Sequence, residues 1–182
     1  MTTRRWMPGI TLLVLLLGRF GLCGAQNMSA PEVPEPLKVP PGEKLLLATH
    51  ALGAQIYTCT LGPDGRLQWI LTAPDAELRD ASGAAIIRHF AGPSWQHHDG
   101  SEVTGKAVAH TSPDPDSVPW LLLEAVSHTG NGVLSRVQHI QRIHTHGGQP
   151  PPAARCDGAR QRSMARIAYT ADYYFFGPSA EH

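Results

Sequence analysis

The stretch YTADYYFF, residues 169–176, decides the fold class, because its aromatic side chains recur with the period of an extended strand. On such a strand they divide between two faces, with Tyr169, Tyr173 and Phe175 on one and Tyr174 and Phe176 on the other. We interpret the stretch as a central strand, buried on one face and largely covered on the other. The alternative interpretation is an aromatic platform for a ligand.

The chain before this stretch repeats the pattern of short strand-like runs separated by turn residues. RLQWIL, at residues 66–71, alternates in the same way, and GPDG at residues 62–65 supplies the turn before it. The sequence therefore predicts an all-β fold, an antiparallel β-sandwich or barrel of about eight to nine short strands. The other predicted strands are residues 44–50, 55–61, 85–90, 102–110, 120–127 and 166–176.

One segment, residues 133–146, fits a helix as well as a strand. Its apolar residues stand at positions 133, 134, 137, 140 and 143, a spacing that suits either period. The β-branched residues and the flanking glycines favour a strand, but the spacing leaves both assignments open.

The N-terminal residues have the pattern of a secretory signal peptide. Two arginines precede an unbroken apolar run, ITLLVLLL at residues 10–17, and the small residues Cys23 and Ala25 form a cleavage site after Ala25. The run is shorter than the roughly 20 residues that a membrane-spanning helix needs. We therefore expect residues 1–25 to be removed and the protein to be secreted or periplasmic.

Removal of the signal peptide sets the charge and the domain organisation. It leaves 157 of the 182 residues and 12 of the 15 basic residues against all 15 acidic ones, a net charge of −3. That charge argues against a nucleic-acid partner, and no later segment is predicted to span a membrane. We expect residues 26–43, with five prolines, to be an extended lead-in outside the core. Residues 44–177 then form a single β domain, and residues 178–182 a C-terminal tail.

Two cysteines, Cys59 and Cys156, remain after the cleavage. An even pair in an oxidising compartment predicts a disulfide bond. The alternative is two isolated buried thiols, and neither cysteine has an activating base near it in the sequence, as a catalytic thiol would need.

The segment HFAGPSWQHHDGS, residues 89–101, concentrates the candidate site residues, and its first interpretation is structural. Gly92-Pro93 turns the chain, Trp95 fills the core, and Asp99 caps the Asp-Gly turn through its own backbone. Arg142 would pair with Asp99 if the two strands adjoin. In this interpretation His97 and His98 are exposed and dispensable.

A second interpretation is a metal site. His144 and His146 would point to one face of a strand, and His89, His97 or His98 would supply a third ligand. Two histidines do not make a site by themselves, so we expect no metal and no cofactor.

A third interpretation is a pocket for a small ligand, a saccharide or a surface component. His89, Trp95, Asp99 and Arg142 are its candidate contacts, and Trp69 or Trp120 could add a flat surface. A hydrolase would use the same residues, with His89 as acid–base partner, Asp99 orienting it and Ser101 as nucleophile. The sequence has no G-x-S-x-G elbow for such a serine.

Five motifs in order resemble the exported family known as domain of unknown function 3455, over residues 37–176. They are AQIYTC, LQWILTAPDAEL, RHFAGPSWQHHDGS, VPWLLLEAVSHTGNGVLSRVQHIQRIHTHGG and IAYTADYYFF. The resemblance implies no activity, because the family has none established. The residues that fit the family pattern are His89, Trp95, Asp99, Gly100, Ser101, Gln141 and Arg142, whereas His97, His98, His144 and His146 depart from it.

Some fungal members of that family carry a malate dehydrogenase label, which this sequence does not support. Its G-x-G, Gly130-Asn131-Gly132, lies between two predicted strands without a third glycine at the spacing of a dinucleotide-binding loop. We interpret it as a hairpin turn. We expect an exported all-β protein that is a binding or structural module, and the alternative is a secreted enzyme, hydrolase-like or metal-dependent, that uses His89, Asp99 and Arg142.

Overall fold

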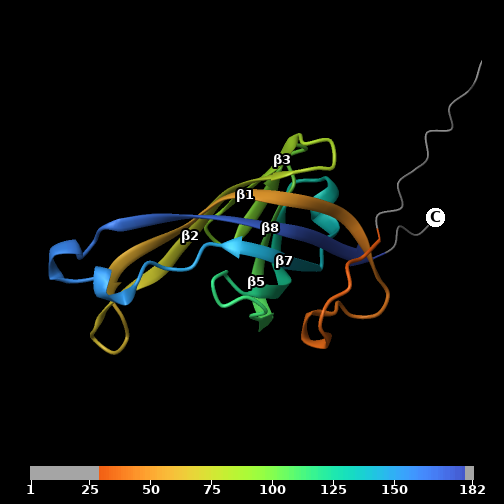
Figure 1. Ribbon diagram of the computed structural model, residues 1–182. Helices are drawn as coiled ribbons and strands as arrows, with labels where there is room; N and C mark the ends of the chain where they lie inside the picture. Colours follow the sequence, from red (N-terminus) through yellow and green to blue (C-terminus); the bar gives the residue numbers. More distant parts are fainter. Residues whose placement is uncertain (1–28, 179–182) are drawn as a thin grey trace, which may run out of the picture.

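The computed structural model describes residues 29–178, and its eight strands pair in chain order around a closed antiparallel barrel (Figure 1). Each strand pairs with the next one along the chain, and β1 pairs with β8 to close the ring. The predicted all-β antiparallel fold is confirmed. The strands are β1 (Glu43–Leu61), β2 (Leu67–Arg79), β3 (Ala85–Phe90), β4 (Ser94–His97), β5 (Glu102–Thr111), β6 (Trp120–Thr129), β7 (His139–Gly147) and β8 (Met164–Pro178).

The strands β1 and β8 are long and run across the whole molecule (Figure 1). The runs predicted at residues 44–50 and 55–61 are one strand, because β1 continues to pair with β2 and β8 through the residues between them. Gly53 lies in the middle of this strand. A Cβ there would stand 2.3 Å from the backbone oxygen of Asp75, so the close approach of β2 explains the glycine.

The aromatic stretch of β8 is buried as its period predicts. Tyr169, Tyr173 and Phe175 point into the barrel and join its main core cluster. On the outer face Phe176 is buried, and Tyr174 packs against a second, smaller cluster. β8 is therefore a strand with both faces covered.

The N-terminal lead-in forms this second cluster on the outside of the barrel. Leu37, in the short 3-10 helix η1 (Glu35–Leu37), is completely buried and packs with Leu122 of β6 and Ile143 of β7. The side chain of Gln141 donates a hydrogen bond to the Leu37 carbonyl at 2.8 Å. The expectation that the lead-in stays outside the core is wrong at Leu37, because the outer face of β6 and β7 is itself apolar and requires a cover.

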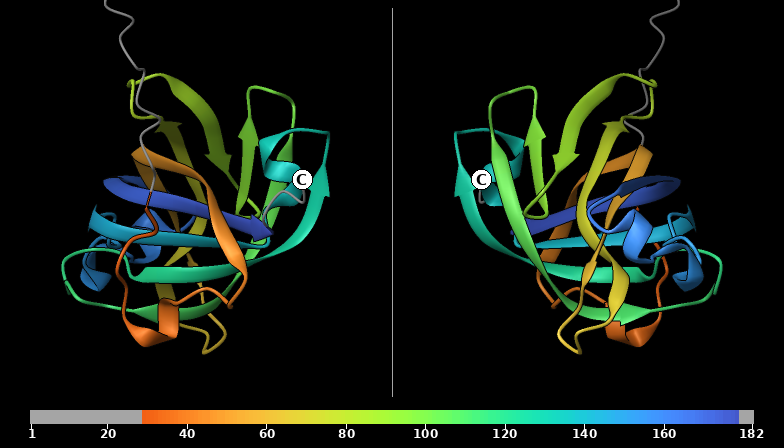
Figure 2. Two further views of the ribbon diagram at one scale, coloured as in Figure 1. Left: turned by 90° about the vertical axis from the view of Figure 1, so that its right-hand side faces the viewer. Right: turned by 90° about the vertical axis from the view of Figure 1, so that its left-hand side faces the viewer.

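The ambiguous segment 133–146 contains two elements. A 3-10 helix, η2 (Val133–Arg136), comes first, and β7 follows it. Leu134 and Val137 are fully buried in the main core, so η2 and the residue after it close one end of the barrel (Figure 2). Gly130-Asn131-Gly132 is the bend that leads into η2 rather than a tight hairpin turn.

Cys59 and Cys156 form a disulfide bond, as predicted, with their Cα atoms 5.4 Å apart. The bond ties β1 to the connection between the short 3-10 helices η3 (Ala153–Arg155) and η4 (Gly158–Arg160). Residues 29–178 include no helix that is long and apolar enough to cross a membrane. The predicted signal peptide, residues 1–25, lies outside the described residues, as does the tail beyond residue 178.

Candidate functional site

The barrel encloses a cavity of about 310 Å³, and every one of its eight strands contributes a lining residue. The cavity occupies the part of the interior that η2 does not fill. Most of its wall is apolar, with Leu71, Leu121 and Leu123 among the larger side chains. The polar residues that line it are few, and they include the predicted site residues His89 and Arg142.

The cavity opens where the barrel wall is incomplete. The hairpin of β3 and β4 stands between β2 and β5 (Figure 2), but β2 pairs with β3 only through Ala76–Arg79, and β5 pairs with β4 only through Glu102–Thr104. Beyond the Gly92-Pro93 turn of this hairpin, no strand fills the space between β2 and β5 in the described chain. Leu71 and Ala107 line the cavity on these two strands and are exposed, so they form its rim.

His89 is fully buried on β3 and contributes a neutral imidazole to the cavity wall. Its Nδ1 lies 2.9 Å from the backbone oxygen of Ser94, an acceptor, so the ring hydrogen is on Nδ1. The pKa of His89 is lowered to about 3, chiefly by burial; the hydrogen bond to Ser94 opposes this shift, and the positive charge of Arg142 adds to it. At neutral pH, Nε2 of His89 is therefore a hydrogen-bond acceptor.

Trp95 fills the core from β4, as predicted, and it also forms part of the cavity wall. The side chain is 1% exposed, and its ring lies edge-on to Tyr173 and Phe175. Its Nε1 is enclosed and has no hydrogen-bond partner within residues 29–178. A buried indole N–H normally finds a partner, so this donor needs an explanation.

Arg142 brings a positive charge into the barrel from β7, where it is only 8% exposed. Its Nε and Nη2 both donate to the Pro119 carbonyl, at 3.2 and 2.8 Å. No ion pair to Arg142 forms within residues 29–178, and none of the described acidic residues lines the cavity. Burial raises the pKa values of Tyr57 and Tyr173, and the Arg142 charge opposes this rise, so its field reaches across the interior.

Gln55 is a cavity residue that the sequence reasoning missed. It is 1% exposed on β1, and its Nε2 is enclosed without a hydrogen-bond partner in the described chain. One signal could have found it: a polar residue at an even spacing from Ala51, on the face of β1 that points inward.

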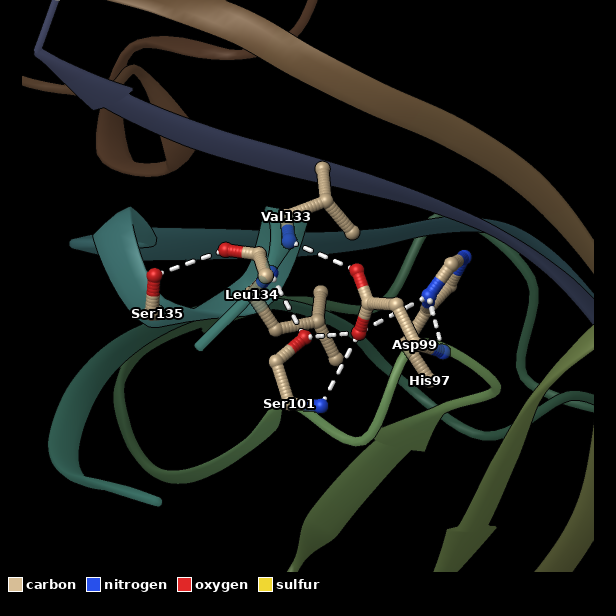
Figure 3. Close-up of polar contacts among 7 residues, drawn as sticks. His97, Asp99, Ser101, Val133, Leu134 and Ser135 are labelled. Atoms are coloured by element: carbon tan, nitrogen blue, oxygen red, sulfur yellow. Dashed lines mark hydrogen bonds and ion pairs between the residues drawn. The ribbon is translucent and has the colours of Figure 1, made fainter. Parts of the chain in front are cut away.

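Asp99 lies away from the cavity, at the end of the barrel that η2 closes (Figure 3). Its Oδ1 accepts hydrogen bonds from the Ser101 amide at 2.9 Å and the Ser101 hydroxyl at 2.6 Å, and its Oδ2 accepts from the Val133 amide at 2.8 Å. Desolvation raises the pKa of Asp99, but these hydrogen bonds outweigh it and hold the pKa below its usual range. Asp99 caps its own turn, as predicted, and also anchors η2. The predicted pairing of Asp99 with Arg142 is wrong, because Arg142 faces the interior and bonds to Pro119.

The arrangement expected of a hydrolase is not formed. The Ser101 hydroxyl donates to Asp99 and accepts from the Leu134 amide at 3.1 Å, so it serves the anchoring of η2. His89 bonds to the Ser94 carbonyl and stacks on Trp95, so it orients neither Ser101 nor Asp99. The three residues therefore belong to two different parts of the molecule.

The four remaining candidate histidines lie at or near the surface. His98 is exposed, as predicted, but His97 is half-buried and its Nδ1 accepts from the Asp99 amide at 3.1 Å, so the expectation that His97 is exposed is wrong. His144 and His146 are both exposed on β7, and Nδ1 of His144 bonds to Asp172 at 2.9 Å. Residues 29–178 contain no group of three or more His, Cys, Asp or Glu side chains that could hold a metal ion.

The comparisons with known proteins give a family but no activity. A protein-family model matches residues 40–177, which is most of the chain and all of the barrel except the ends. The chain belongs to the family described as protein of unknown function (DUF3455). No curated protein and no solved structure matches it. The cavity is therefore the feature of this DUF3455 chain that bears on its function.

Proposed function

We propose that this DUF3455 protein is an exported binding module that takes a small molecule into its barrel cavity. One observation carries the proposal: two enclosed donors, Gln55 Nε2 and Trp95 Nε1, have no partner in the described chain and belong to side chains that line the cavity. Leaving a buried donor unpaired costs about 1–3 kcal/mol, and folded proteins rarely accept that cost without a reason. A bound ligand that supplies acceptors would remove this cost by drawing the two N–H groups, which are enclosed in the ligand-free protein, towards the cavity.

The architecture supports the same proposal. A barrel of about eight strands is just wide enough to hold one small ligand in its interior. Binding sites for small molecules are concave, mostly apolar and provided with a few polar groups, within about 300–1,000 Å³. A cavity of about 310 Å³ lies at the lower end of that range, so the ligand should be small.

Export is the second part of the proposal. The signal-peptide pattern of residues 1–25 supports it, and the disulfide between Cys59 and Cys156 is compatible with an oxidising compartment. N-terminal sequencing of the protein from the culture medium or periplasm should begin near Gln26. An intact Met1 on the mature protein would contradict export.

The binding proposal is tested with a neutral, environment-sensitive dye, N-phenyl-1-naphthylamine, whose fluorescence rises in an apolar site. Ala107 is exposed at the rim, so Ala107→Trp should block the mouth without overpacking the core. Val126→Trp is the matched control, because Val126 is exposed on β6 and does not line the cavity.

Wild type and Val126→Trp should bind the dye saturably with one site, and Ala107→Trp should bind it at least about tenfold more weakly, a difference of about 1.4 kcal/mol. Equal binding by all three proteins, or no saturable binding by wild type, would contradict the proposal.

A further inference from the structure

Arg142 is a buried charge that no acidic residue of the described chain balances. The residue is 8% exposed, and the hydrogen bonds that its Nε and Nη2 donate both end on one neutral acceptor, the Pro119 carbonyl. The Tyr173 hydroxyl is a second neutral group in contact with the Arg142 side chain, and no acidic side chain of residues 29–178 forms an ion pair with it. Buried charges are normally paired, because removing an ion from water is costly and a neutral carbonyl returns only part of that cost.

The groups around the cavity add donors and no negative charge. Gln55 Nε2 and Trp95 Nε1 are enclosed N–H donors without a partner, and neither a described aspartate nor a described glutamate lines the wall. His89 stays neutral, so it does not compete with Arg142 for an anion and does not supply a second cation. Against one neutral acceptor, His89 Nε2, the interior therefore has a positive charge without a described counter-ion and two N–H donors without a partner, which matches a ligand rich in acceptors.

The remaining wall defines the body of such a ligand. Leu71, Leu121 and Leu123 line the cavity, and Leu71 continues to the exposed rim. A hydrated inorganic ion would leave this apolar surface unused and would have to give up its water against it. An apolar chain or ring would instead bury the leucine surface together with its own.

We infer that the cavity binds a small organic carboxylate with an apolar body, with the carboxylate on Arg142 and the body against the leucines. This inference rests on the proposed function, because it names the class of ligand for the same cavity. Gln55 and Trp95 are the further donors to acceptor atoms of that ligand. A carboxylate on a guanidinium forms charge-assisted hydrogen bonds, about twice as strong as neutral ones.

The test compares two probes of equal chain length, octanoate and octan-1-ol, by calorimetric titration of the mature, oxidised protein. The two probes differ at the head group, so the difference between their affinities measures the contribution of the carboxylate charge to binding. Octanoate should bind at least about tenfold more tightly than octan-1-ol. Acetate, which has the same head group without the apolar body, should bind at least about tenfold more weakly than octanoate.

Two variants assign the effect to Arg142. Arg142→Gln keeps a donor for the Pro119 carbonyl and removes the charge, so it should abolish the preference for octanoate over octan-1-ol. Arg88→Gln is the matched control, because Arg88 is exposed on β3 and does not line the cavity, and it should keep the preference. If Arg142→Gln does not fold, the comparison of octanoate with octan-1-ol on wild type still tests the carboxylate inference. Gln55→Leu adds a second test, because it should weaken octanoate binding.

The outcomes separate the two proposals. If octanoate and octan-1-ol bind wild type equally, or only octan-1-ol binds, the cavity is a binding site but the carboxylate inference is wrong. The inference is also wrong if acetate binds as tightly as octanoate, or if Ala107→Trp leaves octanoate binding unchanged. If the neutral dye binds and both octyl probes fail, only the carboxylate inference fails. If wild type binds neither the dye nor either octyl probe, the carboxylate inference and the proposed function are both wrong.

Discussion

The His89 imidazole lies flat on the Trp95 indole, with ring centroids 4.4 Å apart and an angle of 7° between the planes. The two residues are directly opposite each other on β3 and β4, so the hairpin holds the stack in place. Both side chains belong to the buried interior, and both line the cavity. The stack therefore joins the stability of the barrel to the shape of its candidate binding site, and changes there should affect both.

Trp95→Ala should lower the free energy of unfolding by about 3–5 kcal/mol, because it removes a buried ring and leaves a larger void between β4 and β8. Urea unfolding measures the change. His98→Ala on the same hairpin is the control and should stay within about 0.5 kcal/mol of wild type, since His98 is exposed. A Trp95→Ala protein as stable as wild type would mean that the indole does not support the barrel.

His89 should make the protein less stable in mild acid. Its pKa in the folded protein is about 3, below the ordinary value of 6.5, so the unfolded chain binds more protons between these two pH values. Stability should therefore fall as the pH is lowered from about 6.5 towards 3, by about 2 kcal/mol between pH 7 and pH 5. His89→Gln should remove that part of the loss. Urea unfolding of both proteins at pH 7 and pH 5 is the measurement, and equal losses would rule out this role of His89.

Asp99→Ala should cost about 1–3 kcal/mol, because it leaves the amides of Ser101 and Val133 without their acceptor and frees η2. Asp116→Ala removes the same charge from an exposed turn and should cost less than about 0.5 kcal/mol. Hydrogen exchange should also become faster at the amides of Val133 and Leu134 in Asp99→Ala. Unchanged exchange at those two amides would show that Asp99 does not anchor η2.

The bond between Cys59 and Cys156 closes a loop with a sequence separation of 97 residues, and loop-closure entropy assigns it about 4–5 kcal/mol. The double variant Cys59→Ala/Cys156→Ala should lose about 2–5 kcal/mol, and adding a reducing agent should destabilise wild type but not the variant. Peptide mapping without reduction should recover the two peptides linked. Freely alkylated thiols in native protein would contradict the bond.

The barrel wall was predictable because a strand shows its buried face in its local sequence. The period of two in β8 placed Tyr173 and Phe175 in the interior, and the turns around β4 indicated that Trp95 fills the core. The burial of Leu37 was not predictable, since it depends on an apolar patch formed by β6 and β7, far along the chain. The start of η2 was not predictable for the same reason. Its first amides donate hydrogen bonds to the side chains of Asp99 and Ser101, which lie more than 30 residues earlier in the chain.

The cavity was predictable in part. His89, Trp95 and Arg142 were candidates from the sequence, and the structure places all three on its wall. Asp99 was grouped with them because it lies close to Trp95 in the sequence, but the short β4 carries the two residues towards opposite ends of the hairpin. The absence of an acidic partner for Arg142 among the described residues is a property of the closed barrel. No local sequence pattern indicates this absence.

Leucine methyl groups test the central claim, binding inside the barrel, most directly. Leu121 and Leu123 line the cavity, whereas Leu37 and Leu134 are fully buried in the outer cluster and at the closed end. In methyl NMR spectra of the mature protein titrated with octanoate, the resonances of Leu121 and Leu123 should shift saturably, and those of Leu37 and Leu134 should stay in place. Saturable shifts confined to Leu37 and Leu134 would contradict a binding site in the barrel, and so would the absence of any shift of the four with octanoate and with N-phenyl-1-naphthylamine alike.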